Sequence, residues 1–512
     1  MLARVRSLGL RGVEGFGVSV ELDLAGGLPA FSTVGLPDHA VRESRERVSS
    51  AVRNSGFKFP SRRITVNLAP ARARKEGSHY DLPIALAVLA ASGQVPPGDW
   101  SQNWCFVGEL SLDGRVRPVP GVLAMAERAR AEGCSAIVVP VDNAREAEAA
   151  GLKAFPVEDL REAVALLEGA APRPRPADAP ASETSASWEE LSDVRGQTLA
   201  KRALEIAAAG GHNILLIGPP GTGKSMLARR LPGLLPPMTE AEAVEVTKVQ
   251  SAYGRPPSGG LTRCRPFRAP HHASSAAALI GGGPTARPGE VCLAHGGVLF
   301  LDELPEFTRP ALEALRQPLE DRVVRVARAR ESVEYPSRFL LVAAANSCPC
   351  GWRGHPRRAC SCSPGAVGRY LGRLSGPLLD RIDLQVETAA VPFGDWAGQA
   401  SPADSSSLAK GRVEAARARQ RERLGEGPAA LNAFVSAAEA RRQARLGAEA
   451  LGVLSAAEKK TALSARGLDR VLRVGRTIAD LEGARDVSCA HLAEALQYRG
   501  LDRLRSGLEE LR

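Results

Sequence analysis

The stretch NILLIGPPGTGKS, residues 213–225, decides the fold of the central part of the chain. Its first half is a short apolar run, typical of a buried strand. Its second half has the spacing Gly-x-x-x-x-Gly-Lys-Ser of a phosphate-binding loop. The residues that follow, MLARRL, continue as a helix whose amino terminus would face the phosphates. Strand, loop and helix in this order predict an α/β domain with a parallel sheet and a nucleotide site.

The residues of this loop have separate expected roles in binding ATP with Mg²⁺. Glycine lets backbone N–H groups wrap around the phosphates, the lysine reaches the β- and γ-phosphates, and the serine hydroxyl binds Mg²⁺. We therefore expect the nucleotide to be held by Gly218, Pro219, Pro220, Gly221, Thr222, Gly223, Lys224 and Ser225.

A second motif, GGVLFLDE at residues 296–303, supplies two carboxylates. Four apolar residues predict a buried strand that carries Asp302 and Glu303 to its carboxyl end, where parallel sheets bind ligands. We expect Asp302 to hold Mg²⁺ and Glu303 to orient and polarise the attacking water. The alternative is that the two carboxylates belong to a solvated turn. The motif lies at a plausible distance from the phosphate loop for a nucleotide site, which argues against that alternative.

Two further residues suit phosphoryl transfer. FLLVAAAN, residues 339–346, predicts another buried strand, and its terminal Asn346 is placed to sense the γ-phosphate. SGPLLDRIDLQVE, residues 375–387, offers Arg381 as an arginine supplied to the site of a neighbouring subunit, which would require a ring or filament. The alternative for Arg381 is a structural ion pair with Asp380 or Asp383.

Several of these segments together resemble one family. FRAPHHASSAAALIGGG, LAHGGVLFLDE and LLDRIDL are similar to the magnesium-chelatase-like AAA+ proteins, and within them to the YifB/ComM family. The resemblance extends over nearly the whole chain. It implies an AAA+ ring, expected to be a hexamer, of the branch that includes magnesium chelatase and MCM helicases. It also implies that Arg473, in DRVLRVGRTIADL, is the second sensor arginine on a helix of a carboxyl-terminal lid.

The amino-terminal part resembles a different enzyme that has lost its catalytic pair. VGELSLDGRVRPVPGVLAMAERARAEGCSAIVVP, residues 107–140, is similar to the end of a Lon-type protease domain, an α+β fold. Working enzymes of that kind use a serine that a lysine activates. Alignment by eye places His79 at the serine position, one residue from Ser78, and Leu123 at the lysine position. We therefore expect a domain that serves subunit assembly or DNA contact.

SCPCGWRGHPRRACSCSP, residues 347–364, contains two Cys-x-Cys pairs, Cys348 with Cys350 and Cys360 with Cys362. Four thiolates in a short loop rich in Gly and Pro suit tetrahedral Zn²⁺, although Cys-x₂-Cys pairs are the commoner spacing. Four reduced cysteines without a metal are the alternative. Three arginines of the same loop are candidates for contact with nucleic acid: Arg353, Arg357 and Arg358.

PLEDRVVRVARARESVEYPSRF, residues 318–339, predicts a β-hairpin with a charged tip. In related helicases a hairpin at this place grips DNA in the central pore, which makes Arg325, Arg328 and Arg330 candidate phosphate ligands. A solvated hairpin tip is the alternative.

Composition shifts divide the chain of 512 residues. Stretches rich in small and polar residues predict linkers at 169–187 and 393–411. They separate a Lon-like domain at 1–168, an AAA+ core at 188–392 with its cysteine-rich loop at 347–364, and a helical lid at 412–512. No apolar run is long enough to span a bilayer and no signal peptide is evident, so we expect a cytoplasmic protein without a membrane partner.

The chain carries a net charge of +10, which suits either an acidic partner or a mildly basic protein without one. Two functions compete. The first is an ATP-dependent motor on branched or single-stranded DNA, a branch-migration helicase in recombination or natural transformation, as the ComM resemblance implies. The second is a chelatase-type motor that acts on a protein partner without moving DNA. An ATP-dependent protease is disfavoured by the missing lysine.

Overall fold

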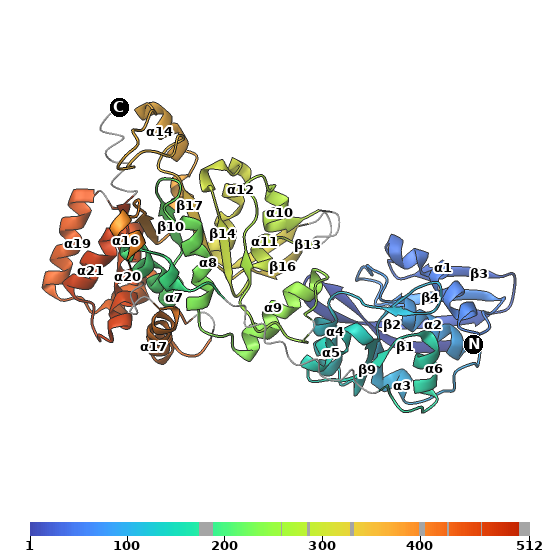
Figure 1. The fold of residues 1–512 in the computed structure, drawn as a ribbon. Helices are drawn as coiled ribbons and strands as arrows, with labels where there is room; N and C mark the ends of the chain where they lie inside the picture. The colour runs from blue at the N-terminus through green and yellow to red at the C-terminus, as the bar shows by residue number, and fades with distance from the viewer. Residues whose placement is uncertain are drawn as a thin grey trace.

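The computed structural model describes residues 1–173, 188–257, 259–283, 287–327, 332–398, 405–427, 430–461 and 463–500. Figure 1 shows three regions in chain order: a sheet with helices at the amino terminus, a central sheet, and a helical carboxyl-terminal region. None of the described helices combines the length and the apolar character that a bilayer-spanning segment requires.

The amino-terminal region is built on a mixed sheet with the strand order β3-β4-β2-β1-β5-β8-β9. β1 and β2 form a long antiparallel hairpin, and β5, β8 and β9 are parallel. The strands are β1 (Leu2–Arg11), β2 (Glu14–Ala25), β3 (Ala30–Val34), β4 (Arg63–Ala69), β5 (Trp104–Phe106), β8 (Ala136–Pro140) and β9 (Lys153–Val157), with a small ladder of β6 (Glu109–Leu110) and β7 (Val116–Arg117). The helices are α1 (His39–Asn54), α2 (Asp81–Ala91), α3 (Trp100–Asn103), α4 (Val122–Ala131), α5 (Ala144–Ala149) and α6 (Leu160–Leu167).

The central region is a parallel sheet with the strand order β11-β14-β17-β10-β18. Its strands are β11 (Phe267–Arg268), β14 (Val298–Leu301), β17 (Leu340–Ala345), β10 (Ile214–Ile217) and β18 (Leu384–Glu387). Three of them are wholly buried, as expected for a sheet covered on both faces. The helices around it are α7 (Thr198–Gly210), α8 (Lys224–Leu234), α9 (Glu240–Ala252), α10 (Ala276–Ile280), α11 (Glu290–Leu293), α12 (Arg309–Ala314), α13 (Arg316–Asp321), α14 (Pro364–Leu371), α15 (Gly376–Leu379) and α16 (Phe393–Ala397). This confirms the expected α/β class.

Two small ladders lie outside the central sheet. β12 (Gly281–Gly282) pairs with β13 (Arg287–Pro288), and β15 (Val323–Ala327) pairs with β16 (Ser332–Pro336). The second ladder is the antiparallel hairpin that the sequence predicts between the strands β14 and β17. Its tip lies outside the described residues, and so do Arg328 and Arg330.

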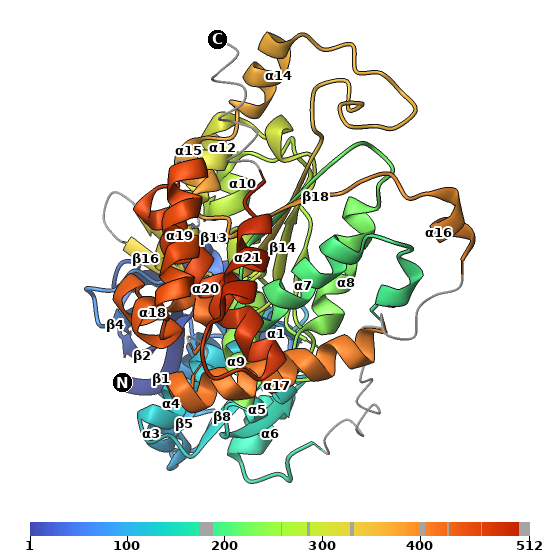
Figure 2. The ribbon, with the colours of Figure 1, turned by 90° about the vertical axis from the view of Figure 1, so that its left-hand side faces the viewer.

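The carboxyl-terminal region is helical, as expected, and packs onto the central sheet. Its helices are α17 (Ser406–Leu424), α18 (Ala437–Ala444), α19 (Ala448–Thr461), α20 (Ala465–Glu482) and α21 (Cys489–Gln497). Figure 2 shows α17 running beside α7 and α8, while α20 and α21 lie together. Val471 and Ile478 of α20 belong to the same buried apolar cluster as Leu204 of α7. The lid therefore shares a core with the sheet region.

The structure differs from the expected linker boundaries at one place. The short helix α16 and the first turns of α17, from Ser406, lie within residues 393–411. The Ser405 hydroxyl caps α17 by accepting a hydrogen bond from the backbone N–H of Leu408 at 3.4 Å, so this serine-rich stretch starts a helix. Most of the other expected linker, residues 174–187, lies outside the described residues.

Contacts of the amino-terminal region with the central region include those with α9 and those with the β15–β16 hairpin. On α9, Lys248 forms an ion pair of 2.7 Å with Glu127, and the Ser251 hydroxyl accepts a hydrogen bond of 2.8 Å from the backbone N–H of Gly121. At the second place the β1–β2 turn lies on the β15–β16 hairpin. A Cβ atom on Gly12 would come within 2.4 Å of a Val333 methyl carbon, so only glycine fits there.

Candidate nucleotide site

The parallel central sheet brings the expected motifs to one edge. β10, β14 and β17 end at Ile217, Leu301 and Ala345, and the phosphate loop, the Asp302–Glu303 pair and Asn346 follow these ends directly. Because the strands pair in parallel with matching register, their carboxyl ends lie side by side. The three motifs predicted from separate stretches of sequence therefore meet at a single place.

Lys224 lies at the centre of this place. Its ammonium donates hydrogen bonds to the carbonyls of Gly218 at 2.7 Å and Pro219 at 2.9 Å, and to Asn346 Oδ1 at 3.3 Å. Burial lowers the pKa of this lysine, while the Asp302 carboxylate opposes the shift. The side chain is held inside the loop, where a phosphate group could replace the carbonyls as its partner.

The two expected Mg²⁺ ligands are already in contact. Ser225 Oγ donates a hydrogen bond of 2.8 Å to Asp302 Oδ2. The other oxygen of Asp302 accepts a 2.9 Å bond from the backbone N–H of Glu303. A hydroxyl and a carboxylate held at this spacing are oxygen ligands of the kind that Mg²⁺ takes beside substrate phosphates.

Glu303 is positioned by its backbone and by a histidine that sequence reasoning missed. It has a left-handed backbone (φ +51°), which is uncommon for a residue other than glycine. Its carboxylate lies 3.2 Å from Nδ1 of His272, and the rings of His271 and His272 pack together. His272 belongs to the FRAPHH segment that carries the family resemblance, but no spacing in the sequence pairs it with Glu303.

The phosphate loop itself requires glycine at its first position. A Cβ atom on Gly218 would lie 2.2 Å from the carbonyl oxygen of Thr388, which follows the neighbouring strand β18. The Thr222 hydroxyl also contacts that of Thr388 at 2.8 Å. Strand β18 therefore fixes the loop from outside, although the motif pattern does not include it. Gln197, likewise missed, donates hydrogen bonds to the carbonyls of Thr222 and Ala389.

Arg381 and Arg473 lie at the opposite edge of the sheet. The amide of Asn213, just before β10, donates to the backbone carbonyl of Arg381 at 2.9 Å. The Thr477 hydroxyl joins the carbonyl of Arg473 to the ring of His212, also just before β10. Both arginines lie near the amino end of β10, and the phosphate loop follows its carboxyl end. The four residues of β10 span roughly 10–13 Å at about 3.3 Å each, which is the separation between the arginines and the phosphate loop of the same chain.

The side chain of Arg381 does not make the ion pairs considered from sequence. It contacts Glu320 at the end of α13 and donates a hydrogen bond to the carbonyl of Pro377 at 2.6 Å. Asp383 instead pairs with His212 at 3.0 Å and lies 3.6 Å from Arg470. Nε of Arg473 is buried and donates no hydrogen bond to any described atom.

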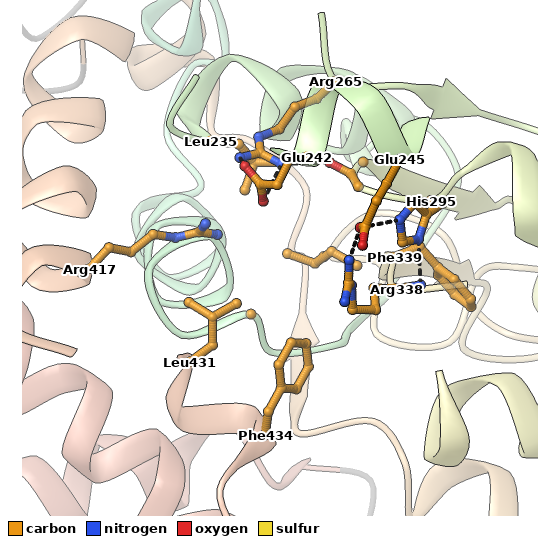
Figure 3. A pocket seen from close by; sticks show the side chains of 14 residues that line it. Leu235, Glu242, Glu245, Arg265, His295, Arg338, Phe339, Arg417, Leu431 and Phe434 are labelled. Atoms are coloured by element: carbon orange, nitrogen blue, oxygen red, sulfur yellow. Dashed lines mark hydrogen bonds and ion pairs between the residues drawn. The ribbon is translucent and has the colours of Figure 1, made fainter. Parts of the chain in front are cut away.

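A cavity of about 60 Å³ between the sheet region and the lid is not a nucleotide site. Figure 3 shows Arg417 of α17 reaching in from one side and the cluster of Glu245, His295 and Arg338 on the other. Glu245 contacts both His295 and Arg338, Arg265 pairs with Glu242 at 3.1 Å, and Arg417 donates to the carbonyl of Ala208 at 2.7 Å, so each of these side chains has a partner within the protein. Small-molecule sites usually measure about 300–1,000 Å³. We interpret this cavity as part of the lid interface.

The four cysteines of the loop after Asn346 converge. The Sγ atoms of Cys348, Cys350, Cys360 and Cys362 all lie within 4.8 Å of one another. Three backbone N–H groups donate to these sulfurs at 3.4 Å, from Arg353, Cys350 and Cys362. Hydrogen bonds from backbone N–H groups, first that of Trp352, lower the pKa of Cys350 to about 6. Such N–H···S contacts stabilise thiolates, the form that binds metal.

The residues that would carry protease chemistry in the amino-terminal region have other partners. His79 is buried, and burial lowers its pKa to about 4. Leu123 is fully buried in an apolar cluster. The Ser78 hydroxyl contacts the Glu109 carboxylate, while the buried ammonium of Lys75 contacts the carbonyl of Pro70. The serine and this nearby lysine therefore bind different groups.

Of the candidate DNA ligands on the hairpin, Arg325 is described. Its guanidinium is half-exposed and pairs with Glu334 of the facing strand at 2.6 Å. This ion pair satisfies the charge locally, so a phosphate would have to compete with Glu334.

Three family models match consecutive parts of the chain. They are magnesium chelatase subunit ChlI at residues 190–395, subunit ChlI of Mg-chelatase at 20–143, and the carboxyl-terminal part of magnesium chelatase subunit ChlI at 403–499. The chain is 45% identical to YifB of Escherichia coli K12, with 100% of this chain and 99% of that protein covered. It is 42% identical to competence protein ComM of Haemophilus influenzae, with 100% of both covered.

A more distant similarity covers about a third of the chain. The magnesium-chelatase 67 kDa subunit of Heliobacterium mobile is 28% identical over 198 residues, which are 32% of this chain and 29% of that subunit.

Proposed function

Because the chain belongs to the YifB/ComM family of magnesium-chelatase-like AAA+ motors, we propose that it hydrolyses ATP in a ring of like subunits and uses the energy to move DNA. The observation that carries the proposal is the meeting of Lys224, Ser225, Asp302, Glu303 and Asn346 at one edge of the central sheet. ATP turnover by the purified chain, with and without branched DNA, is the direct test.

Each residue at this edge has one proposed role in the chemistry. Lys224 and the loop N–H groups bind the phosphates, Ser225 and Asp302 hold Mg²⁺, and Asn346 contacts the γ-phosphate. Glu303 orients the attacking water, and His272 keeps its carboxylate in place. Mg²⁺ held by Ser225 and Asp302 would neutralise part of the negative charge of the phosphates.

The opposite edge supports assembly into a ring, proposed to be a hexamer. Arg381 and Arg473 lie a strand length from their own phosphate loop, so neither is placed to reach the nucleotide of its own subunit. A neighbour in a closed ring would present its Arg381 edge to that nucleotide, where an arginine stabilises the charge that develops in the transition state. Arg473 would reach the site in the same way.

DNA as the partner rests on three observations. One relative of full length is named a competence protein. The chain carries a net charge of +10. An arginine-rich hairpin projects between β14 and β17, where we propose that Arg325, Arg328 and Arg330 bind phosphates. Branch migration in recombination or transformation is the specific activity that we propose.

A second candidate function has its own support. All three matching family models describe magnesium chelatase subunits, and Arg325 is already paired with Glu334, with which a phosphate would have to compete. A motor of that type would act on a protein partner, and its ATP turnover would ignore branched DNA.

We propose that the amino-terminal region is not a protease. A leucine at the position of the activating lysine cannot act as a base. The nearby Lys75 is engaged with Pro70, and the Ser78 hydroxyl contacts Glu109. Its role would instead be in subunit assembly or DNA contact, since this region packs on α9 and on the hairpin that carries the proposed DNA ligands.

The hairpin proposal predicts the behaviour of the double variant Arg328→Ala, Arg330→Ala. Arginines that bind phosphates do not read bases, so DNA affinity should be independent of sequence and steeply dependent on salt. The double variant should weaken binding and abolish stimulation of turnover by DNA. It should also lower the slope of log affinity against log salt by roughly 0.7–0.9 for each phosphate that is no longer bound. Fluorescence anisotropy over a salt series measures the slope.

A matched control removes the same charge elsewhere. Arg441 and Arg442 are exposed on α18 and pair with Asp469 and Glu439. Arg441→Ala with Arg442→Ala should leave the salt slope and DNA stimulation close to wild type. If the hairpin variant still migrates branched DNA normally, the hairpin is not the DNA grip.

We also propose that the cysteine cluster holds one Zn²⁺ per chain. Four convergent thiols with N–H···S contacts fit a tetrahedral site in both donor set and size. Protein purified without chelator should contain one equivalent of zinc by elemental analysis. Cys348→Ser with Cys360→Ser should release it, whereas Cys264→Ser, outside the loop, should not. Zinc-free protein with full activity would contradict the proposal.

A further inference from the structure

The cysteine loop packs directly against the phosphate loop. Gly351 follows Cys350 and has a left-handed backbone (φ +82°). A Cβ atom built on Gly351 would lie 2.8 Å from Cγ of Pro220, closer than carbon atoms tolerate. Pro220 lies inside the phosphate loop, between Gly218 and Lys224. The two loops are therefore in van der Waals contact, and the contact depends on the missing side chain at residue 351.

A second connection runs through the backbone on the entry side of the cysteine loop. Asn346, which accepts a hydrogen bond from Lys224, is separated by one residue from the buried Cys348. The backbone therefore links the position of Cys348 directly to the residue that contacts Lys224.

The exit side of the loop is anchored near the same site. Tyr370 of α14 is buried and receives a hydrogen bond from the Asn346 backbone. Burial, followed by the charge of Glu306, raises the pKa of Tyr370 to about 12, and the hydrogen bond from Asn346 opposes this rise. Arg373 donates to the carbonyl of Pro305 at 3.1 Å and to the Glu306 carboxylate at 3.0 Å, just beyond Glu303. Both ends of the loop thus attach to elements of the nucleotide site.

We infer that the metal-bound cysteine loop is a positioning element of the nucleotide site, so that zinc and MgATP each strengthen the binding of the other. The inference rests on the proposed zinc site. A metal that joins the two Cys-x-Cys pairs fixes the loop and keeps Gly351 on Pro220 and Asn346 on Lys224. Without the metal, part of the free energy of MgATP binding would be used to order these segments, so the affinity for MgATP would be lower.

Thermodynamic linkage makes the inference quantitative. If zinc raises the affinity for MgATP by some factor, MgATP must raise the affinity for zinc by the same factor. Coupled sites typically show factors of roughly 5–150. We expect a factor of about ten here, since the contact acts on the loop and not on the phosphates themselves.

The test measures both directions of the coupling on the full chain. A fluorescent ATP analogue reports nucleotide affinity for zinc-loaded protein and for protein stripped with a chelator. Competition with a zinc-binding dye reports metal affinity with and without the nucleotide. We expect equal factors in both directions. In addition, the visible spectrum of Co²⁺-substituted protein should change when MgADP binds, which a remote structural metal would not show.

Two glycines of the same loop provide matched variants. Gly351 and Gly354 both have a left-handed φ, +82° and +84°, so alanine is strained at both positions. A Cβ at Gly351 would meet Pro220, whereas a Cβ at Gly354 would have no described atom within 4 Å apart from the glycine itself and its two chain neighbours. Gly351→Ala should retain one zinc, raise KM for ATP about tenfold more than it changes kcat, and abolish the coupling. Gly354→Ala should retain wild-type coupling.

The possible failures are distinguishable. Zinc that is present but can be removed without any change in nucleotide affinity would overturn the coupling and leave the zinc site standing. Equal effects of Gly351→Ala and Gly354→Ala would show general loop strain and also overturn it. Absence of zinc from wild-type protein would overturn the zinc proposal itself, while normal ATP turnover in that protein would leave the motor proposal intact.

Discussion

Glu303→Gln should reduce ATP hydrolysis by several orders of magnitude and leave ATP binding nearly unchanged. The hydrogen bond of Lys224 to the Gly218 carbonyl and that of Ser225 to Asp302 do not involve the Glu303 side chain, so the residues proposed to bind the phosphates and Mg²⁺ should keep their positions. The amide can still bond to His272, but it cannot polarise the attacking water. Binding of a fluorescent ATP analogue and release of phosphate, measured on the same preparation, separate the two effects.

The matched control is Glu313→Gln on α12. Glu313 pairs with Arg316 at 2.7 Å and lies outside the nucleotide site, so the same chemical change should leave turnover close to wild type. Near-normal hydrolysis in Glu303→Gln would show that another carboxylate activates the water.

Arg381→Ala and Lys224→Ala should each abolish most ATP turnover alone, and mixing the two should restore part of it. An arginine supplied in trans commonly contributes about 10³–10⁵ in rate. In a ring mixed at equal ratio, about a quarter of the interfaces pair an intact phosphate loop with an intact Arg381. Turnover measured over a series of mixing ratios should therefore pass through a maximum.

The alternative is that Arg381 acts only through its contact with Glu320. Glu320→Gln removes that ion pair and keeps the arginine, so it should retain most of the turnover if Arg381 works in trans. If Glu320→Gln is as inactive as Arg381→Ala, or if rings shown to be mixed recover nothing, Arg381 is structural.

Local sequence patterns predict the central sheet well because its motifs are short and follow strands directly. The run before Gly218 and the run before Asp302 are apolar, and both form buried strands. The run CFVGEL, residues 105–110, has the composition of one strand but is less regular: it contributes to β5 and β6, which are separated by Val107 and Gly108. The hydrophobic pattern of the sequence does not reveal this break, because apolar residues on both sides of it, such as Phe106 and Leu110, are buried.

Contacts between segments distant in sequence could not be predicted. The approach of His272 to Glu303, of Thr388 to Gly218 and of Gly351 to Pro220 depends on how loops fold over the sheet edge. The edge at which Arg381 lies likewise follows from strand direction, which became clear only with the parallel register of β10 and β18. The motif residues were therefore predictable individually, and their supporting partners were not.

The β1–β2 turn contacts the hairpin where Gly12 lies against Val333. We therefore expect substitutions at these two positions, which are distant in sequence, to be correlated among relatives. A residue larger than glycine at 12 would collide with the valine, so relatives that gain a side chain there should carry a smaller residue at 333. The same contact also couples the position of the β1–β2 turn to that of the hairpin. A movement of the hairpin would therefore either displace the β1–β2 turn with it or break the contact between Gly12 and Val333.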